Sequence, residues 1–297
     1  MGRGSYTASD WAKLKNSRNL GNAKNEKEIF KSTQCNPKFD PKYIQTREAR
    51  DSEDHPESLP IIIGLDVTGS MGYLAEMVAK EALNETMMKL YSTDAVKDPA
   101  LMFAAYGDYD DRSPLQVTQF ESDIRVAEQL LDLWIEDHGE GQVALSLLWH
   151  FAAHHTALDS FEKRKKKGYL FTIGDQAQCR ISMKELDDTY LRVLDDKVQC
   201  SVAETLKQAQ EKFEVFHLFL SDGEKAKTIV NLLPGHTMCI QPGEISAIPE
   251  ILISTIQLAE GKTIPECLAQ WPQLKRPIVE KALRSLKLAD PKKGIVF

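Results

Sequence analysis

Short, continuous runs of apolar residues alternate along this chain with longer segments in which apolar residues recur every three or four positions. The first pattern is typical of strands buried on both faces of a sheet, and the second of helices that cover a sheet. Runs of the first kind predict strands at 60–65, 101–106, 115–120, 168–174, 214–220 and 236–241. Segments of the second kind predict helices at 73–91, 121–136, 142–158, 182–194, 202–213, 225–233 and 245–260.

This alternation predicts an α/β fold with a doubly wound, mostly parallel six-stranded sheet, because parallel strands need helical crossovers between them. The run at 115–120 follows its predecessor too closely for a crossover, so we expect it to be an antiparallel edge strand. The main domain then covers residues 58–260. It is preceded by a polar, basic extension (1–57) and followed by a small helical appendage and tail (261–297). The aromatic residues of the extension favour packing on its own domain over docking on a partner: Trp11, Phe30, Phe39 and Tyr43.

Candidate chemistry follows the first predicted strand, in the segment PIIIGLDVTGSMG. Asp66, Thr68 and Ser70 place one carboxylate and two hydroxyls at alternate positions. Such a set of hard oxygen ligands is typical of Mg²⁺ or Mn²⁺ and not of zinc. The carboxyl ends of strands are also where open α/β sheets bind their ligands. The segment therefore predicts a metal site.

The segment resembles the metal-ion-dependent adhesion site of von Willebrand factor type A domains, whose first motif is Asp-x-Ser-x-Ser. Here the motif reads Asp66-Val67-Thr68-Gly69-Ser70, and the expected strand topology is also that of this family. The resemblance implies that Asp175, after the run YLFTIG, is a third-loop ligand; a helix cap is the alternative interpretation. The second loop departs from the family, because residues 138–142 lack the expected threonine. Glu140 or Asp108 would have to replace it.

The same resemblance implies a function in metal-bridged protein binding, not in catalysis. An Asp or Glu of a partner protein would displace water from the open face of the cation, within a larger intracellular assembly of the kind that the family forms with AAA-type ATPases. A net charge of −7 argues weakly against nucleic acid as the main partner. No apolar run is long enough to span a membrane, and five scattered cysteines without a CxxC pair favour a reducing cytoplasm.

Two enzyme interpretations compete for the same loop. Asp66-Val-Thr-Gly-Ser also looks like the Asp-Lys-Thr-Gly-Thr of transport ATPases, which would make Asp66 the nucleophile of an Mg²⁺-dependent aspartyl phosphotransferase of the haloacid dehalogenase type. Soluble members of that class have a second Asp where this chain has Thr68. A serine hydrolase would use Ser70 with Asp222 and His236, but its nucleophile elbow needs glycine at position 68.

Three histidines lie close together in the predicted helix at 142–158. His150 and His154 are four residues apart, and His155 is adjacent. This spacing can bind zinc, although the catalytic zinc motif needs a glutamate at position 151, which is Phe. The alternative is a helix face whose histidines are solvated or hydrogen-bonded.

Overall fold

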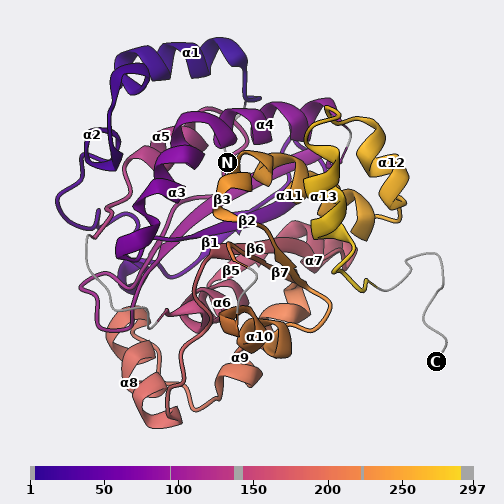
Figure 1. Ribbon diagram of the computed structural model, residues 1–297. Helices are drawn as coiled ribbons and strands as arrows, with labels where there is room; N and C mark the ends of the chain where they lie inside the picture. Colours follow the sequence, from indigo (N-terminus) through magenta and orange to yellow (C-terminus); the bar gives the residue numbers. More distant parts are fainter. Residues whose placement is uncertain (1–3, 94, 137–142, 222–223, 289–297) are drawn as a thin grey trace.

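The computed structural model describes residues 4–93, 95–136, 143–221 and 224–288 (Figure 1). Its central sheet has six strands in the order β4-β3-β2-β6-β7-β8, and all neighbours pair in parallel except β4 with β3. The strands are β2 (Ser58–Asp66), β3 (Asp98–Tyr106), β4 (Leu115–Val117), β6 (Gly168–Gly174), β7 (Phe213–Phe219) and β8 (Thr237–Cys239). The predicted mostly parallel sheet with one antiparallel edge strand is confirmed.

Helices cover both faces of this sheet because successive strand side chains point to opposite faces. On β2, Ile61 and Ile63 enter one hydrophobic core, whereas Ile62 enters the other. The first core is closed by α1 (Ala8–Ser17), α3 (Gly72–Met77), α4 (Leu83–Ser92), α5 (Arg125–Leu131) and α11 (Ile248–Ala259). The second is closed by α6 (Leu145–His154), α8 (Met183–Leu194), α9 (Val202–Lys212) and α10 (Glu224–Leu232). Both faces of the central strands are therefore shielded from solvent.

The predicted helices differ from the observed ones mainly at their ends. The helix expected at 73–91 is observed as α3 and α4, joined by a wide π turn at Val78–Ala82. The helix expected at 142–158 ends at His154, and Thr156–Leu158 form β5, which pairs in parallel with β1 (Arg47–Ala49). Helical periodicity could not reveal this strand, because its partner lies about 110 residues earlier in the chain.

The segments before and after the sheet both contribute to its first core. Trp11, Phe30 and Phe39 of the N-terminal extension are buried there, whereas Tyr43 is exposed. Thr7 caps α1 by accepting a hydrogen bond from the Asp10 amide at 3.1 Å. After α11, two short helices pack on it, α12 (Ile264–Ala269) and α13 (Arg276–Leu283). No helix in the described part of the chain is both long and apolar enough to cross a membrane.

Asp159 ties the two-stranded sheet to α7 (Asp159–Arg164) through a buried carboxylate. Its oxygens accept hydrogen bonds from Arg50 Nη1 at 2.9 Å, the Asp51 amide at 2.9 Å and Lys163 Nζ at 2.7 Å. Burial alone would raise the pKa of Asp159, but the bonds from Lys163, Asp51 and Arg50 outweigh it and lower the pKa to about 2. The folded state therefore binds this proton less readily than the unfolded chain does.

We expect acid to weaken the fold through this carboxylate. Because the folded pKa is lower than the ordinary value of 3.8, its contribution is complete above about pH 4 and is lost as the pH falls towards 2. In urea unfolding at pH 6 and at pH 3, Asp159→Asn should lose less stability between the two conditions than the wild type. Asp132→Asn, at a half-exposed position, should keep the wild-type difference. Equal pH sensitivity of all three proteins would contradict the assignment.

Candidate metal centre

Asp66 ends the central strand β2 with a carboxylate that has no exposure to solvent. Its Oδ1 accepts hydrogen bonds from the Thr68 amide at 2.9 Å and from the Thr68 hydroxyl at 2.6 Å. Its Oδ2 is buried and has no hydrogen-bond partner among the described residues. A buried carboxylate oxygen without a hydrogen-bond partner destabilises the fold unless a positively charged group binds it.

The next strand leaves room for this carboxylate because it ends in glycine. β6 pairs with β2 so that Ile173 lies opposite Leu65, which puts Gly174 beside Asp66. A Cβ atom at Gly174 would lie 2.6 Å from Asp66 Oδ2 and 3.0 Å from Tyr106 Oη. Tyr106 is itself fully buried, and its hydroxyl donates to the Ile173 carbonyl at 2.9 Å. Gly174 and Tyr106 thus shape the site, and the strand pattern did not single out either of them.

Two further carboxylates follow neighbouring strands at the same edge of the sheet. Asp175 comes directly after β6, and Asp108 comes two residues after β3, whose Tyr106 lies opposite Asp66. The sheet therefore brings the ends of three parallel strands together, as the sequence predicts for its acidic turns. Asp175 is half-buried, and its Oδ1 also lacks a hydrogen-bond partner among the described residues. Asp108 is buried, and its amide donates to Asp111 Oδ2 at 2.8 Å.

The carboxylates at this edge of the sheet lie close enough together to repel one another. Burial raises the pKa of Asp66 to about 7, the two Thr68 hydrogen bonds oppose that rise, and the charges of Asp175 and Asp108 add to it. Tyr73 on α3 is affected as well: partial burial and then the charges of Asp175 and Asp66 raise the pKa of its hydroxyl. A bound cation would offset the repulsion between these carboxylates.

The remaining predicted ligands are only partly within the described structure. The Thr68 side chain is buried beside Asp66, as the motif requires. Ser70 lies in the short 3₁₀ helix Gly69–Met71, and its side chain is outside the described residues, as is Glu140. The identity of the second-loop ligand therefore stays a prediction.

A cavity of about 300 Å³ opens beside the same loop. Val67 and Gly69 line one side of it, and Phe30 of the N-terminal extension lines another with Trp134 and Ile135. Nothing in the sequence pattern indicated that the extension would reach this loop. The candidate metal centre thus borders a cavity whose lining is partly apolar and partly charged, with Lys27, Lys31 and Glu136 among its residues.

Strand direction argues against the serine hydrolase interpretation. Ser70 follows the carboxyl end of β2, whereas His236 directly precedes β8, which runs in the same direction. The two residues therefore lie at opposite edges of the sheet. Asp222, the third member of that triad, is outside the described residues.

The strand order and the hydroxyl-bearing loop after β2 are those that the sequence resemblance implies. A central strand with parallel neighbours on both sides, an antiparallel strand at one edge and helices on both faces complete the arrangement. The fold is of the von Willebrand factor type A kind.

Comparison with known proteins finds structural similarity at low sequence identity. The pilus adhesin SpaC from Lactobacillus rhamnosus GG has a TM-score of 0.47 and 10% identity, over 69% of this chain and 31% of its own. Proximal thread matrix protein 1 from the mussel byssus has a TM-score of 0.44 and 11% identity, over 66% and 47%. Manganese-loaded TRAP from Plasmodium vivax has a TM-score of 0.37 and 11% identity, over 65% and 72%. This chain thus spans less than half of the first two proteins. No model of a known protein family matches the sequence, and no curated protein does.

Proposed function

We propose that this chain is a protein-binding module that holds Mg²⁺ or Mn²⁺ at the end of β2 and uses it to bind an acidic side chain of a partner protein. The observation that carries the proposal is the buried Oδ2 of Asp66, which has no hydrogen-bond partner among the described residues, beside a similar oxygen of Asp175. Oxygen ligands of this kind suit a small hard cation. Asp66, Thr68, Ser70 and Asp175 would hold the ion, with Asp108 or Glu140 in support.

The chemistry of the loop favours binding over bond making. Thr68 donates its hydroxyl to Asp66 Oδ1, so the position two residues after the carboxylate has no acid that could protonate a leaving group. The bound cation would supply an electrophilic position for a partner carboxylate. The cavity beside Val67 and Gly69 would receive a neighbouring side chain of that partner. A cytoplasmic setting, within an assembly such as one containing an AAA-type ATPase, is part of the proposal.

Metal titration of the full chain tests the first half of this function. Calorimetry with Mn²⁺ on protein treated with a chelator should show one site, and Asp66→Ala should abolish it. Asp10→Ala, an exposed carboxylate on α1, should bind like the wild type. Binding that survives in Asp66→Ala would place the metal elsewhere and overturn the proposal.

Capture from a cell lysate tests the second half. Immobilised wild-type chain should retain a partner in Mg²⁺, lose it in a chelator and regain it when Mg²⁺ is restored, whereas Asp66→Ala should not retain it. An acidic residue of the retained protein, replaced by its amide, should then abolish capture. Hydrolysis of a generic phosphate ester that depends on Asp66 would instead favour the phosphotransferase interpretation.

A further inference from the structure

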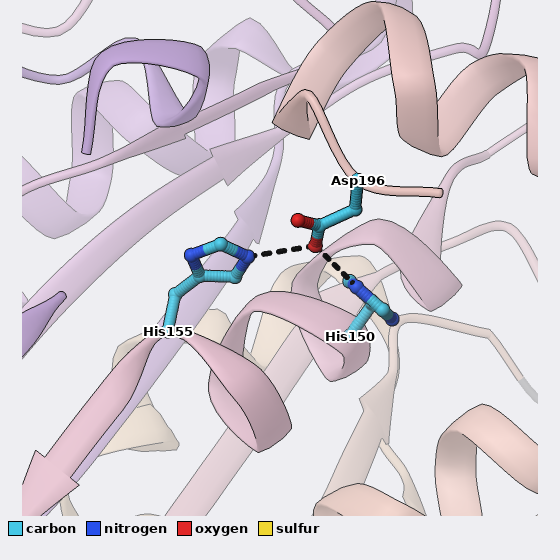
Figure 2. Close-up of side chains that lie close together, drawn as sticks. All are labelled: His150, His155 and Asp196. Atoms are coloured by element: carbon cyan, nitrogen blue, oxygen red, sulfur yellow. Dashed lines mark hydrogen bonds and ion pairs between the residues drawn. The ribbon is translucent and has the colours of Figure 1, made fainter. Parts of the chain in front are cut away.

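A second cluster of metal-binding side chains lies away from Asp66, where α6 ends. His150 is on the last turns of α6, His155 directly follows that helix, and Asp196 is in the segment after α8 (Figure 2). His150 Nε2 and His155 Nε2 lie 2.6 Å and 2.8 Å from the same oxygen, Oδ2 of Asp196. Within the described part of the chain, these are the three side chains whose ligand atoms all lie within 4.8 Å of one another. Two imidazoles thus converge on one carboxylate oxygen.

The contacts of His155 show which of its ring nitrogens donates. Its Nδ1 lies 3.1 Å from the carbonyl oxygen of Gln45, which can only accept, so Nδ1 must carry the proton. Its Nε2 faces the Asp196 carboxylate, which is also an acceptor. A neutral imidazole has one N–H and cannot donate to both. With Nδ1 donating to Gln45, a neutral His155 would present its Nε2 lone pair to the side of Asp196.

The surroundings of His150 fix the position of its imidazole ring. His150 is 1% exposed, so its imidazole is enclosed by protein. Its ring stacks on Tyr190 with centroids 4.4 Å apart, which sets the direction of Nε2.

The backbone brings these side chains together before any ion binds. Asp195 ends α8 in the left-handed conformation with φ of 59°, which turns the chain so that Asp196 meets α6. The amide of Arg47 donates to the carbonyl of His155 at 2.8 Å, as β1 begins to pair with β5. The Gln45 carbonyl orients His155 in the way that a carbonyl commonly orients a metal-binding histidine. Three segments distant in sequence therefore meet at this point.

This cluster is separate from the candidate metal centre at Asp66. The amide of Ala144, before α6, donates to Gly107 O at 2.9 Å, so α6 begins at the carboxyl edge of the sheet. At the other end, Lys212 Nζ donates to Thr156 O at 3.0 Å, and β7 begins one residue after Lys212, so α6 ends at the amino edge. Helix α6 has ten residues and is about 15 Å long.

We propose that His150, His155 and Asp196 form a binding site for a zinc ion. Two imidazoles and one carboxylate form a ligand set that zinc accepts at about 2.0–2.2 Å, with water in the fourth position. Imidazole nitrogen also favours zinc over Mg²⁺, which the oxygen-rich site at Asp66 suits better. Binding would replace the two hydrogen bonds to Asp196 Oδ2 and move the three ligand atoms apart, because atoms bound to one tetrahedral zinc ion lie farther apart than a hydrogen bond allows. The ion would then link the end of α6 to the segment after α8.

Zinc titration of the untagged full chain tests the site after treatment with a chelator. In an Asp66→Ala background, which removes the other centre, Zn²⁺ should still bind one equivalent, and Co²⁺ should give the visible absorption of a low-symmetry site. His155→Gln and Asp196→Asn should each weaken Zn²⁺ binding at least about tenfold, because each removes a ligand and not only its support. Asp196→Glu, which keeps a carboxylate, should recover part of the affinity.

His154→Gln is the matched control, because His154 is on the same helix but is exposed and bonds to Gln208 Oε1 at 3.0 Å. This variant should bind Zn²⁺ like the wild type. Thermal melting covers a variant that folds poorly: Zn²⁺ should raise the Tm of the wild type and of His154→Gln, but not of Asp196→Asn. The site is overturned if no equivalent of Zn²⁺ binds, or if His154→Gln loses as much affinity as His155→Gln. Loss of Mn²⁺ binding in Asp66→Ala with Zn²⁺ binding intact separates the two sites.

Discussion

Replacing Gly174 with alanine is expected to weaken Mg²⁺ or Mn²⁺ binding about 10- to 100-fold, the range found when residues that orient a metal ligand are changed. The new Cβ would lie 2.6 Å from Asp66 Oδ2 and 2.7 Å from Asp66 Cβ, closer than such atoms approach in proteins. Asp66 has no room to move away, because it is buried between two strands and held by Thr68. Calorimetric titration with Mn²⁺ measures the change.

Gly168→Ala is the matched control for this variant. Gly168 begins the same strand, at the edge of the sheet away from Asp66, and a Cβ there would lie 2.7 Å from Pro60 Cγ and 3.0 Å from Phe213 Cδ1. The two alanine variants should therefore lose comparable stability, but only Gly174→Ala should lose metal affinity. Equal Mn²⁺ affinities in both variants would show that the Asp66 carboxylate is not a ligand.

Replacing Trp271 with alanine should lower the free energy of unfolding by about 3–5 kcal/mol, the usual cost of deleting a large buried aromatic side chain. Trp271 lies between α12 and α13, is 3% exposed and belongs to the first core of the sheet. Its Nε1 donates to Ser254 Oγ on α11 at 2.7 Å, and Lys89 Nζ of α4 lies 4.9 Å from the centre of its ring. The C-terminal helices are thereby joined to the main core.

Urea unfolding measures this effect, with Leu274→Ala as the control from the same connection. Leu274 is 91% exposed, so its truncation should change stability by less than about 0.5 kcal/mol. Trp271→Phe, which keeps much of the apolar contact but loses the N–H, should fall between the two. A cost below about 1 kcal/mol for Trp271→Ala would mean that the residues after α11 form an appendage independent of the main core.

The fold could be predicted largely because each central strand is a local pattern. Ile61, Ile62, Ile63 and Leu65 are apolar without alternation, and only a strand covered on both faces needs that. The short connection before Leu115 fixed the antiparallel edge strand for the same local reason. By contrast, β1 and β5 are each three residues long and stabilise each other across the chain, so neither has a pattern of its own.

The candidate metal centre also combines features that the local sequence predicts with features that only packing determines. The order of residues alone placed Asp66, Thr68 and Asp175 at strand ends, because motif spacing and strand boundaries are properties of the chain. Only packing decided that Gly174 and Tyr106 surround Asp66, that Phe30 reaches the same loop, and that Asp196 meets His150 and His155. Those contacts join segments from tens to more than a hundred residues apart. They arise from the burial of whole faces of the sheet, which no short stretch of sequence encodes.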